Sequence, residues 1–209
     1  MSEIKLNKAP ARNRSAACLA TALTCAAITL CHPVLAQTAQ STLVSIEASV
    51  SLEWDQTKGV YIAIGDAIVE QDDKRLKADE IVARYDPQSE GRDLTDVTAT
   101  GSVAFINGDN VARGAKLDYI IGDDTYDLAG PQAIVTSPRG RMTATGSITY
   151  NASDIANKQV LAIGAATYED DTGRVVEGER VVAILGEDGS MNTIDAEGEA
   201  KVVTPKGIV

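Results

Sequence analysis

Four adjacent pairs of acidic residues are the first groups in this sequence that could carry chemistry. Two carboxylates can bind calcium, or can act together in glycoside hydrolysis when they lie about 5 to 9.5 Å apart. No pair has the Asp-x-Asp-x-Asp-Gly spacing of a calcium loop, and each lies in a predicted turn, where Asp accepts local backbone hydrogen bonds. We therefore expect structural turns and neither a metal site nor a catalytic centre. The pairs are Asp72-Asp73, Asp123-Asp124, Asp170-Asp171 and Glu187-Asp188.

Thiol and imidazole groups are confined to the beginning of the chain. Cys18, Cys25, Cys31 and His32 are the only cysteines and the only histidine among 209 residues. Without that segment, the protein has no disulfide, no Cys or His catalyst and no His/Cys metal site. The formal net charge of −11 also argues against nucleic-acid binding. We therefore expect no enzymatic activity, no cofactor and no nucleic-acid partner.

Arg139-Gly-Arg141, directly after Pro138, is the basic motif that could contact a phosphate. The simpler interpretation is a solvated turn. Trp54 is interpreted as a residue that packs at the end of a strand, with a ligand platform as the alternative.

The first 36 residues have the pattern of a secretory signal peptide. Basic residues between Lys5 and Arg14 precede an apolar run over residues 16–30, and Val34-Leu35-Ala36 follows. A basic segment, a short apolar segment and a small-residue site are typical of export signals. The run is shorter than the roughly 20 residues that a membrane-spanning helix needs. We predict cleavage between Ala36 and Gln37 and a periplasmic location, with retention as a membrane anchor as the alternative.

The remaining sequence, residues 37–209, is interpreted as a single repeating domain. Glycine recurs 29 to 36 residues apart, at positions 65, 101, 130, 164 and 198, and apolar residues lie two and four positions on either side of it. This period of two predicts strands with one buried face, and the glycine marks a kink. In the third copy Pro131 shifts the pattern by one residue and predicts a bulge.

Strands of a second type are predicted between the glycine strands, over residues 76–85, 111–119, 142–150 and 175–183. The fold class is therefore all-β, with roughly 14 to 16 short antiparallel strands in stacked turns. The buried positions of the glycine strands are Tyr61, Ala63, Ala67, Val69, Val97, Ala99, Val103, Phe105, Tyr126, Leu128, Ala133, Val135, Val160, Ala162, Ala166, Tyr168, Ile194 and Ala196.

Three motifs carry a resemblance to a known family. They are Ile46-Glu-Ala with Leu52-Glu-Trp-Asp-Gln-Thr-Lys-Gly59, then Gly65-Asp-Ala-Ile-Val-Glu-Gln71, then Leu76-Lys-Ala-Asp-Glu-Ile81 leading to Tyr85. In these motifs the sequence resembles the periplasmic lipopolysaccharide-transport bridge proteins, the LptA/OstA-like family. The likeness extends over residues 44–205 as a repeat and over 46–120 at the level of motifs. Asp66 stands where the family usually has Asn.

This resemblance implies a twisted β-jellyroll that is open along one side. Its groove, lined by the buried positions named above, would receive the acyl chains of lipopolysaccharide. Subunits would stack head to tail, and would meet an inner-membrane export complex and an outer-membrane assembly protein of the same fold.

The sequence itself suggests which residues would meet at such contacts. An alternating strand near the start of the domain carries Val44 and Ile46, and a final apolar strand carries Val202 and Val203. Three alternatives stay open at this point: a membrane-anchored export subunit of the same fold, a structural β-solenoid without a ligand, and a carbohydrate-active enzyme that uses turn carboxylates.

Overall fold

Fourteen β-strands make up the part of the chain that the structure describes, which confirms the all-β prediction. The structure is a computed structural model, and it describes residues 44–89, 92–154 and 158–205, all within one unit, Ser41–Val209. In these ranges no helix is long and apolar enough to cross a membrane. The predicted cleavage site, Ala36 and Gln37, lies outside the described residues.

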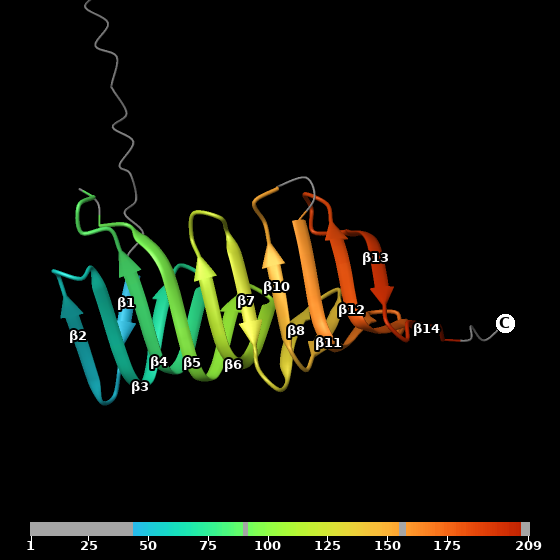
Figure 1. Ribbon diagram of the computed structural model, residues 1–209, viewed down its shortest axis with the longest axis horizontal. Helices are drawn as coiled ribbons and strands as arrows, with labels where there is room; N and C mark the ends of the chain where they lie inside the picture. The colour runs from blue at the N-terminus through green and yellow to red at the C-terminus, as the bar shows by residue number, and fades with distance from the viewer. Residues whose placement is uncertain (1–43, 90–91, 155–157, 206–209) are drawn as a thin grey trace, which may run out of the picture. The chain divides into compact units, whose positions relative to one another are not determined.

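All strand pairs are antiparallel and belong to one sheet (Figure 1). The strands are β1 (Val44–Glu47), β2 (Ser51–Asp55), β3 (Val60–Gln71), β4 (Lys74–Tyr85), β5 (Leu94–Asn107), β6 (Asn110–Ile120), β7 (Thr125–Ala129), β8 (Ala133–Ser137), β9 (Gly140–Ala144), β10 (Ser147–Asn151), β11 (Lys158–Asp170), β12 (Val175–Leu185), β13 (Met191–Glu197) and β14 (Lys201–Val203).

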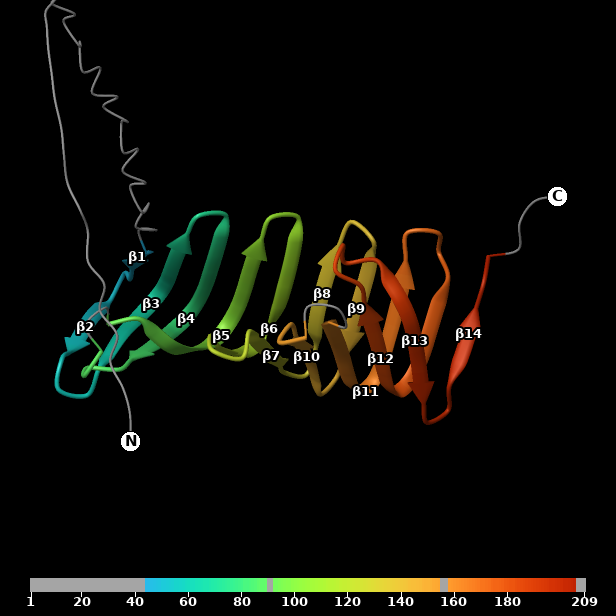
Figure 2. The ribbon, with the colours of Figure 1, turned by 90° about the horizontal axis from the view of Figure 1, so that it is seen from above.

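Six long strands fold this sheet into two layers. β3, β4, β5, β6, β11 and β12 have 11 to 14 residues each. On one side, β3, β6, β11 and β12 pair with a different neighbour along each half, whereas β4 and β5 keep the same two neighbours with an interruption in the pairing. The first layer is completed by β2, β7, β10 and β13, and the second layer by β1, β8, β9 and β14. The hairpins β3–β4, β5–β6 and β8–β9 follow one another along this unit (Figure 2). This arrangement is that of the predicted β-jellyroll.

The recurring glycines lie at the corners where strands pass between the layers. Gly164 and Ala165 have φ angles of 88° and 41°, and the pairing of β11 with β12 is interrupted between Ile163 and Ala166. Left-handed backbone costs an L-residue about 1–2 kcal/mol, so glycine is favoured at the first corner position. The predicted kink is confirmed at this corner.

The third glycine copy differs from the prediction. Gly130 and Pro131 form a turn that separates β7 from β8, in place of one bent strand with a bulge. Proline has no N–H to donate to a neighbouring strand, which accounts for the interruption of the ladder.

The core lies between the two layers and is built largely from small residues. Ala63, Ala67, Ala99, Ala162 and Ala166 are each at most 1% exposed. All eighteen buried positions predicted from the glycine strands belong to this core or pack against it.

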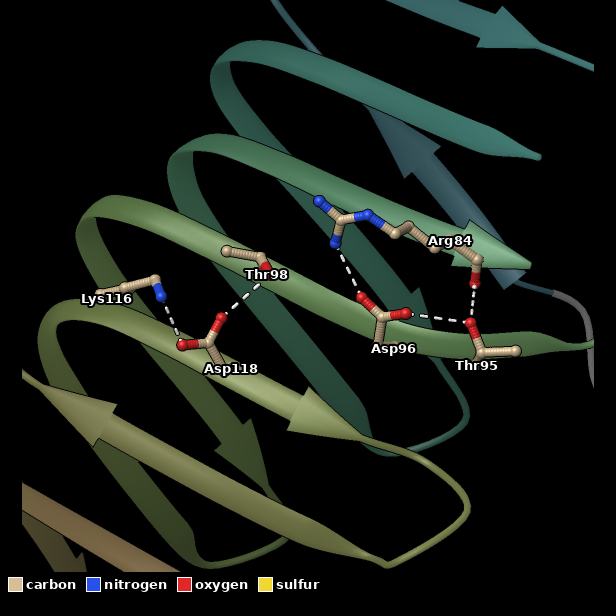
Figure 3. A network of polar contacts seen from close by, with 6 residues as sticks. All are labelled: Arg84, Thr95, Asp96, Thr98, Lys116 and Asp118. Carbon is tan, nitrogen blue, oxygen red and sulfur yellow. Dashed lines mark hydrogen bonds and ion pairs between the residues drawn. The ribbon is translucent and has the colours of Figure 1, made fainter. Parts of the chain in front are cut away.

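The outward side of the first layer is held by polar side chains (Figure 3). Arg84 Nη1 lies 2.7 Å from Asp96 Oδ1, between β4 and β5. Asp118 accepts hydrogen bonds from Lys116 Nζ at 2.6 Å and from Thr98 Oγ1 at 3.0 Å. Alternating with these outward positions of β5, Val97 and Ala99 face the core, as the period of two in a strand requires.

Candidate functional site

A cavity of about 660 Å³ lies between the two layers, from β5 to β13. The first layer contributes Leu117, Leu128 and Ile148 to its wall, and the second contributes Phe105 and Met142. Its volume is within the range of small-molecule and cofactor pockets, about 300–1,000 Å³. An apolar wall of this kind suits an aliphatic chain.

Six of the eighteen residues predicted to line a groove contribute to this wall. They are Phe105, Tyr126, Leu128, Val135, Val160 and Tyr168. The other twelve face the interior, where they pack within the core away from the cavity: Tyr61, Ala63, Ala67, Val69, Val97, Ala99, Val103, Ala133, Ala162, Ala166, Ile194 and Ala196.

Sequence reasoning missed the cavity residues of the second strand type. Leu117 comes from β6, Met142 from β9 and Ile148 from β10, and all three are at most 5% exposed. The same period of two runs through these strands, for example at Leu117 and Tyr119. Extending the alternation to residues 111–119 and 142–150 would have found them.

Aromatic side chains bound the cavity at its N-terminal end. Phe105 of the second layer stacks on Tyr126 of the first, with ring centroids 5.5 Å apart, and Tyr126 also stacks on Tyr119 at 4.0 Å. Of β1 to β4 and their turns, only Asp73 contributes to the cavity wall. Burial raises the pKa of the Tyr126 hydroxyl further above its ordinary value, and this side chain is therefore uncharged at neutral pH.

A second aromatic cluster covers the end of the interior between β2 and β4, with Tyr85 buried and Trp54 45% exposed. Trp54 stacks on Tyr61 with centroids 5.6 Å apart, and its indole Nε1 donates a hydrogen bond to the Tyr85 hydroxyl at 2.8 Å. This is the packing role expected for Trp54. It also explains why Tyr61 is core-facing and yet lies outside the cavity.

The mouth of the cavity is bordered by turns from both layers. The β5–β6 and β8–β9 turns lie on the side of the second layer, and the β12–β13 turn lies on the side of the first. Arg139 Nη2 donates a hydrogen bond to the backbone carbonyl of Asp188 at 3.0 Å, which links the two sides. Arg139 is the one basic residue in the described cavity wall, beside the acidic residues Asp73, Asp109 and Asp188.

Asp170 shows how a carboxylate of an acidic pair serves the turn beside it. Asp170 accepts hydrogen bonds from the Thr172 hydroxyl at 2.6 Å and from the backbone N–H of Arg174 at 2.9 Å, and it pairs with the Arg174 guanidinium at 2.8 Å. These bonds, that of Thr172 first, lower the pKa of Asp170 to about 2. Among the described residues, no group of three or more His, Cys, Asp or Glu side chains could hold a metal ion.

Comparisons with known proteins place this fold in a family. Residues 45–159, more than half of the chain, match the family model described as LptA/(LptD N-terminal domain) LPS transport protein. One similar solved structure is that of LptH, the LptA homologous periplasmic component of the conserved lipopolysaccharide transport device from Pseudomonas aeruginosa. It is 17% identical, the match covers 79% of this chain and 96% of that chain, and the TM-score is 0.33. No curated protein matches. The chain belongs to the family of LptA and LptD N-terminal domain lipopolysaccharide transport proteins.

Proposed function

We propose that this protein binds lipopolysaccharide in the periplasm and carries its acyl chains in the cavity between the two layers. The observation that carries the proposal is the apolar cavity of about 660 Å³ in a chain of a lipopolysaccharide transport family. Each CH₂ group that leaves water for such a wall contributes about 0.8 kcal/mol. Binding of this kind needs no catalytic group, and the family is one of transport proteins.

Periplasmic location is part of this proposal. It rests on the signal-peptide pattern, with cleavage between Ala36 and Gln37. The LptH structure is described as a periplasmic component, which is the location that we infer for this chain.

Photo-crosslinking at two adjacent residues of β5 tests where the lipid lies. Phe105 lines the cavity, whereas Ile106 points to the outer side of the second layer and is 38% exposed. A photoreactive amino acid at position 105 is expected to capture lipopolysaccharide in cells, and one at position 106 is not. Equal capture from both positions would refute the groove, and no capture from either would favour a structural solenoid without a ligand.

We also propose that copies of the protein stack head to tail and bridge the inner-membrane export complex and an outer-membrane assembly protein of the same fold. In the described residues β1 pairs only with β3, and β14 only with β12, so each presents an edge to which a strand can add. Val44, Val202 and Val203 are 41%, 63% and 42% exposed. The side chain of Ile46, by contrast, packs against the core. Ile46 could therefore contact a second copy only through hydrogen bonds of its backbone.

Sedimentation over a range of concentrations tests this association. We expect the wild type to associate weakly, and we expect Val202→Asp to remain monomeric because it places a charge in the contact. Ile120→Asp is the matched control, since Ile120 is 47% exposed and lies at the end of β6, in the middle of the sheet order. A wild type that stays monomeric at high concentration would refute stacking.

A further inference from the structure

Arg139 extends a charged side chain from a rigid backbone at the mouth of the cavity. Its carbonyl accepts hydrogen bonds from the Tyr168 hydroxyl at 3.2 Å and from the backbone N–H of Asp171 at 3.3 Å. Its own N–H donates to Ser137 Oγ at 3.3 Å. The base of this side chain is therefore fixed between β9 and β11, while the guanidinium reaches the opposite side of the mouth.

The guanidinium itself forms no ion pair in the described part of the chain, although its charge helps to lower the pKa of the nearby Asp188 carboxyl group, after the hydrogen bonds from Ser190. One of its donors meets the neutral carbonyl of Asp188, and no carboxylate lies within ion-pair distance. The Asp188 carboxylate accepts a hydrogen bond from the Ser190 N–H at 2.8 Å instead. Because a guanidinium has five N–H donors in a planar fork, most of its capacity for an anion is unused.

We propose that Arg139 is the binding site for the anionic head group of an amphiphile whose acyl chain lies in the cavity. This inference rests on the proposed function. A phosphate is the best fit, because a guanidinium binds it through two parallel hydrogen bonds. The phosphate replaces the Asp188 carbonyl as partner, which also releases the link between the β8–β9 and β12–β13 turns.

The charges around the mouth give this position its selectivity. Asp73, Asp109 and Asp188 repel an anion from the rest of the cavity wall, so the head group has one favourable place to bind. Arg141, two residues further on, does not line the cavity and is exposed on the outward side of β9. Arg141 carries the same charge as Arg139 but does not lie at the mouth of the cavity. It is therefore a matched control for Arg139.

Two probes with the same chain and different head groups test the proposal. Binding of decyl phosphate and of decyl glucoside is measured by titration calorimetry below their critical micelle concentrations, with the wild type, Arg139→Gln and Arg141→Gln. We expect Arg139→Gln to bind decyl phosphate about tenfold more weakly and decyl glucoside unchanged, while Arg141→Gln matches the wild type for both. Added salt should weaken phosphate binding in the wild type more than in Arg139→Gln.

The outcomes separate this inference from the proposed function. If both probes bind and Arg139→Gln loses nothing on decyl phosphate, or loses no more than Arg141→Gln, the head-group site is refuted and the acyl cavity stands. If neither probe binds to any of the three proteins, the acyl cavity fails, and the head-group site fails with it.

Discussion

Replacing Gly164 by alanine tests the corner that creates two layers from one sheet. A Cβ added there would lie 2.8 Å from Thr145 Oγ1 and 2.9 Å from the backbone nitrogen of Gly146. The φ angle of 88° adds the cost of left-handed backbone. Because the nitrogen belongs to the main chain, the clash cannot be relieved by rotating a side chain. The left-handed backbone of an alanine and the shift of the Gly146 backbone should each cost about 1–2 kcal/mol. We therefore expect Gly164→Ala to lower the free energy of unfolding by about 2–4 kcal/mol.

Two other glycines separate these contributions. At Gly189 φ is 73° and an added Cβ meets nothing within 4 Å, so Gly189→Ala carries the conformational cost alone, about 1–2 kcal/mol. At Gly122 an added Cβ also meets nothing within 4 Å and no left-handed φ is present, so Gly122→Ala should change stability by less than about 0.5 kcal/mol. Urea unfolding of all three variants measures the free energies. A Gly164→Ala variant as stable as Gly122→Ala would show that the corner tolerates a side chain, contrary to this reasoning.

Three further predictions concern the core, a turn and export. Val103 is 2% exposed, so Val103→Asp should lower the free energy of unfolding by more than about 3 kcal/mol, whereas Ile106→Asp on the outward side should cost far less in the same urea experiment. Because the pKa of Asp170 is lowered to about 2 in the folded protein, its carboxylate stabilises the fold above pH about 4, and this contribution is lost as the pH falls to about 2. The stability difference between wild type and Asp170→Asn should therefore shrink over that range, and a constant difference would contradict the assignment. Intact-mass measurement of the exported protein should give a chain that begins at Gln37; recovery of the full-length chain in membranes would support the anchored alternative.

The alternation of apolar residues and the spacing of the glycines could be predicted from the sequence. Ala63 and Ala67, on either side of Gly65, both face the interior as the period of two requires. The turn role of Asp170 also follows from residue type, because Asp accepts hydrogen bonds from the backbone two residues further on. These features depend only on residues that are close together in the sequence. The local sequence pattern is therefore sufficient to predict them.

The position of the cavity could not be predicted in this way. It depends on which side chains meet across the two layers, and those side chains come from strands far apart in the sequence. Tyr61 and Tyr85 pack against each other at one end of the interior, and the partly exposed Trp54 stacks on Tyr61. Phe105 and Tyr126 meet across the layers and leave space beyond them. The alternation predicts a groove along all the glycine strands, whereas the cavity is lined by β5 to β13 and by Asp73 of the β3–β4 turn.

The most direct test of the acyl-chain cavity is to identify the lipid that remains bound to the native protein. Protein recovered from the periplasm is analysed by mass spectrometry as the wild type and as two tryptophan variants. Ala112→Trp fills the cavity, because Ala112 lies in its wall beside Phe105 and Val135. Ala104→Trp is the matched control on the outward side of β5. We predict that lipopolysaccharide is recovered with the wild type and with Ala104→Trp, and is strongly reduced with Ala112→Trp; equal recovery from all three proteins, or none from the wild type, would contradict an acyl-chain cavity between the layers.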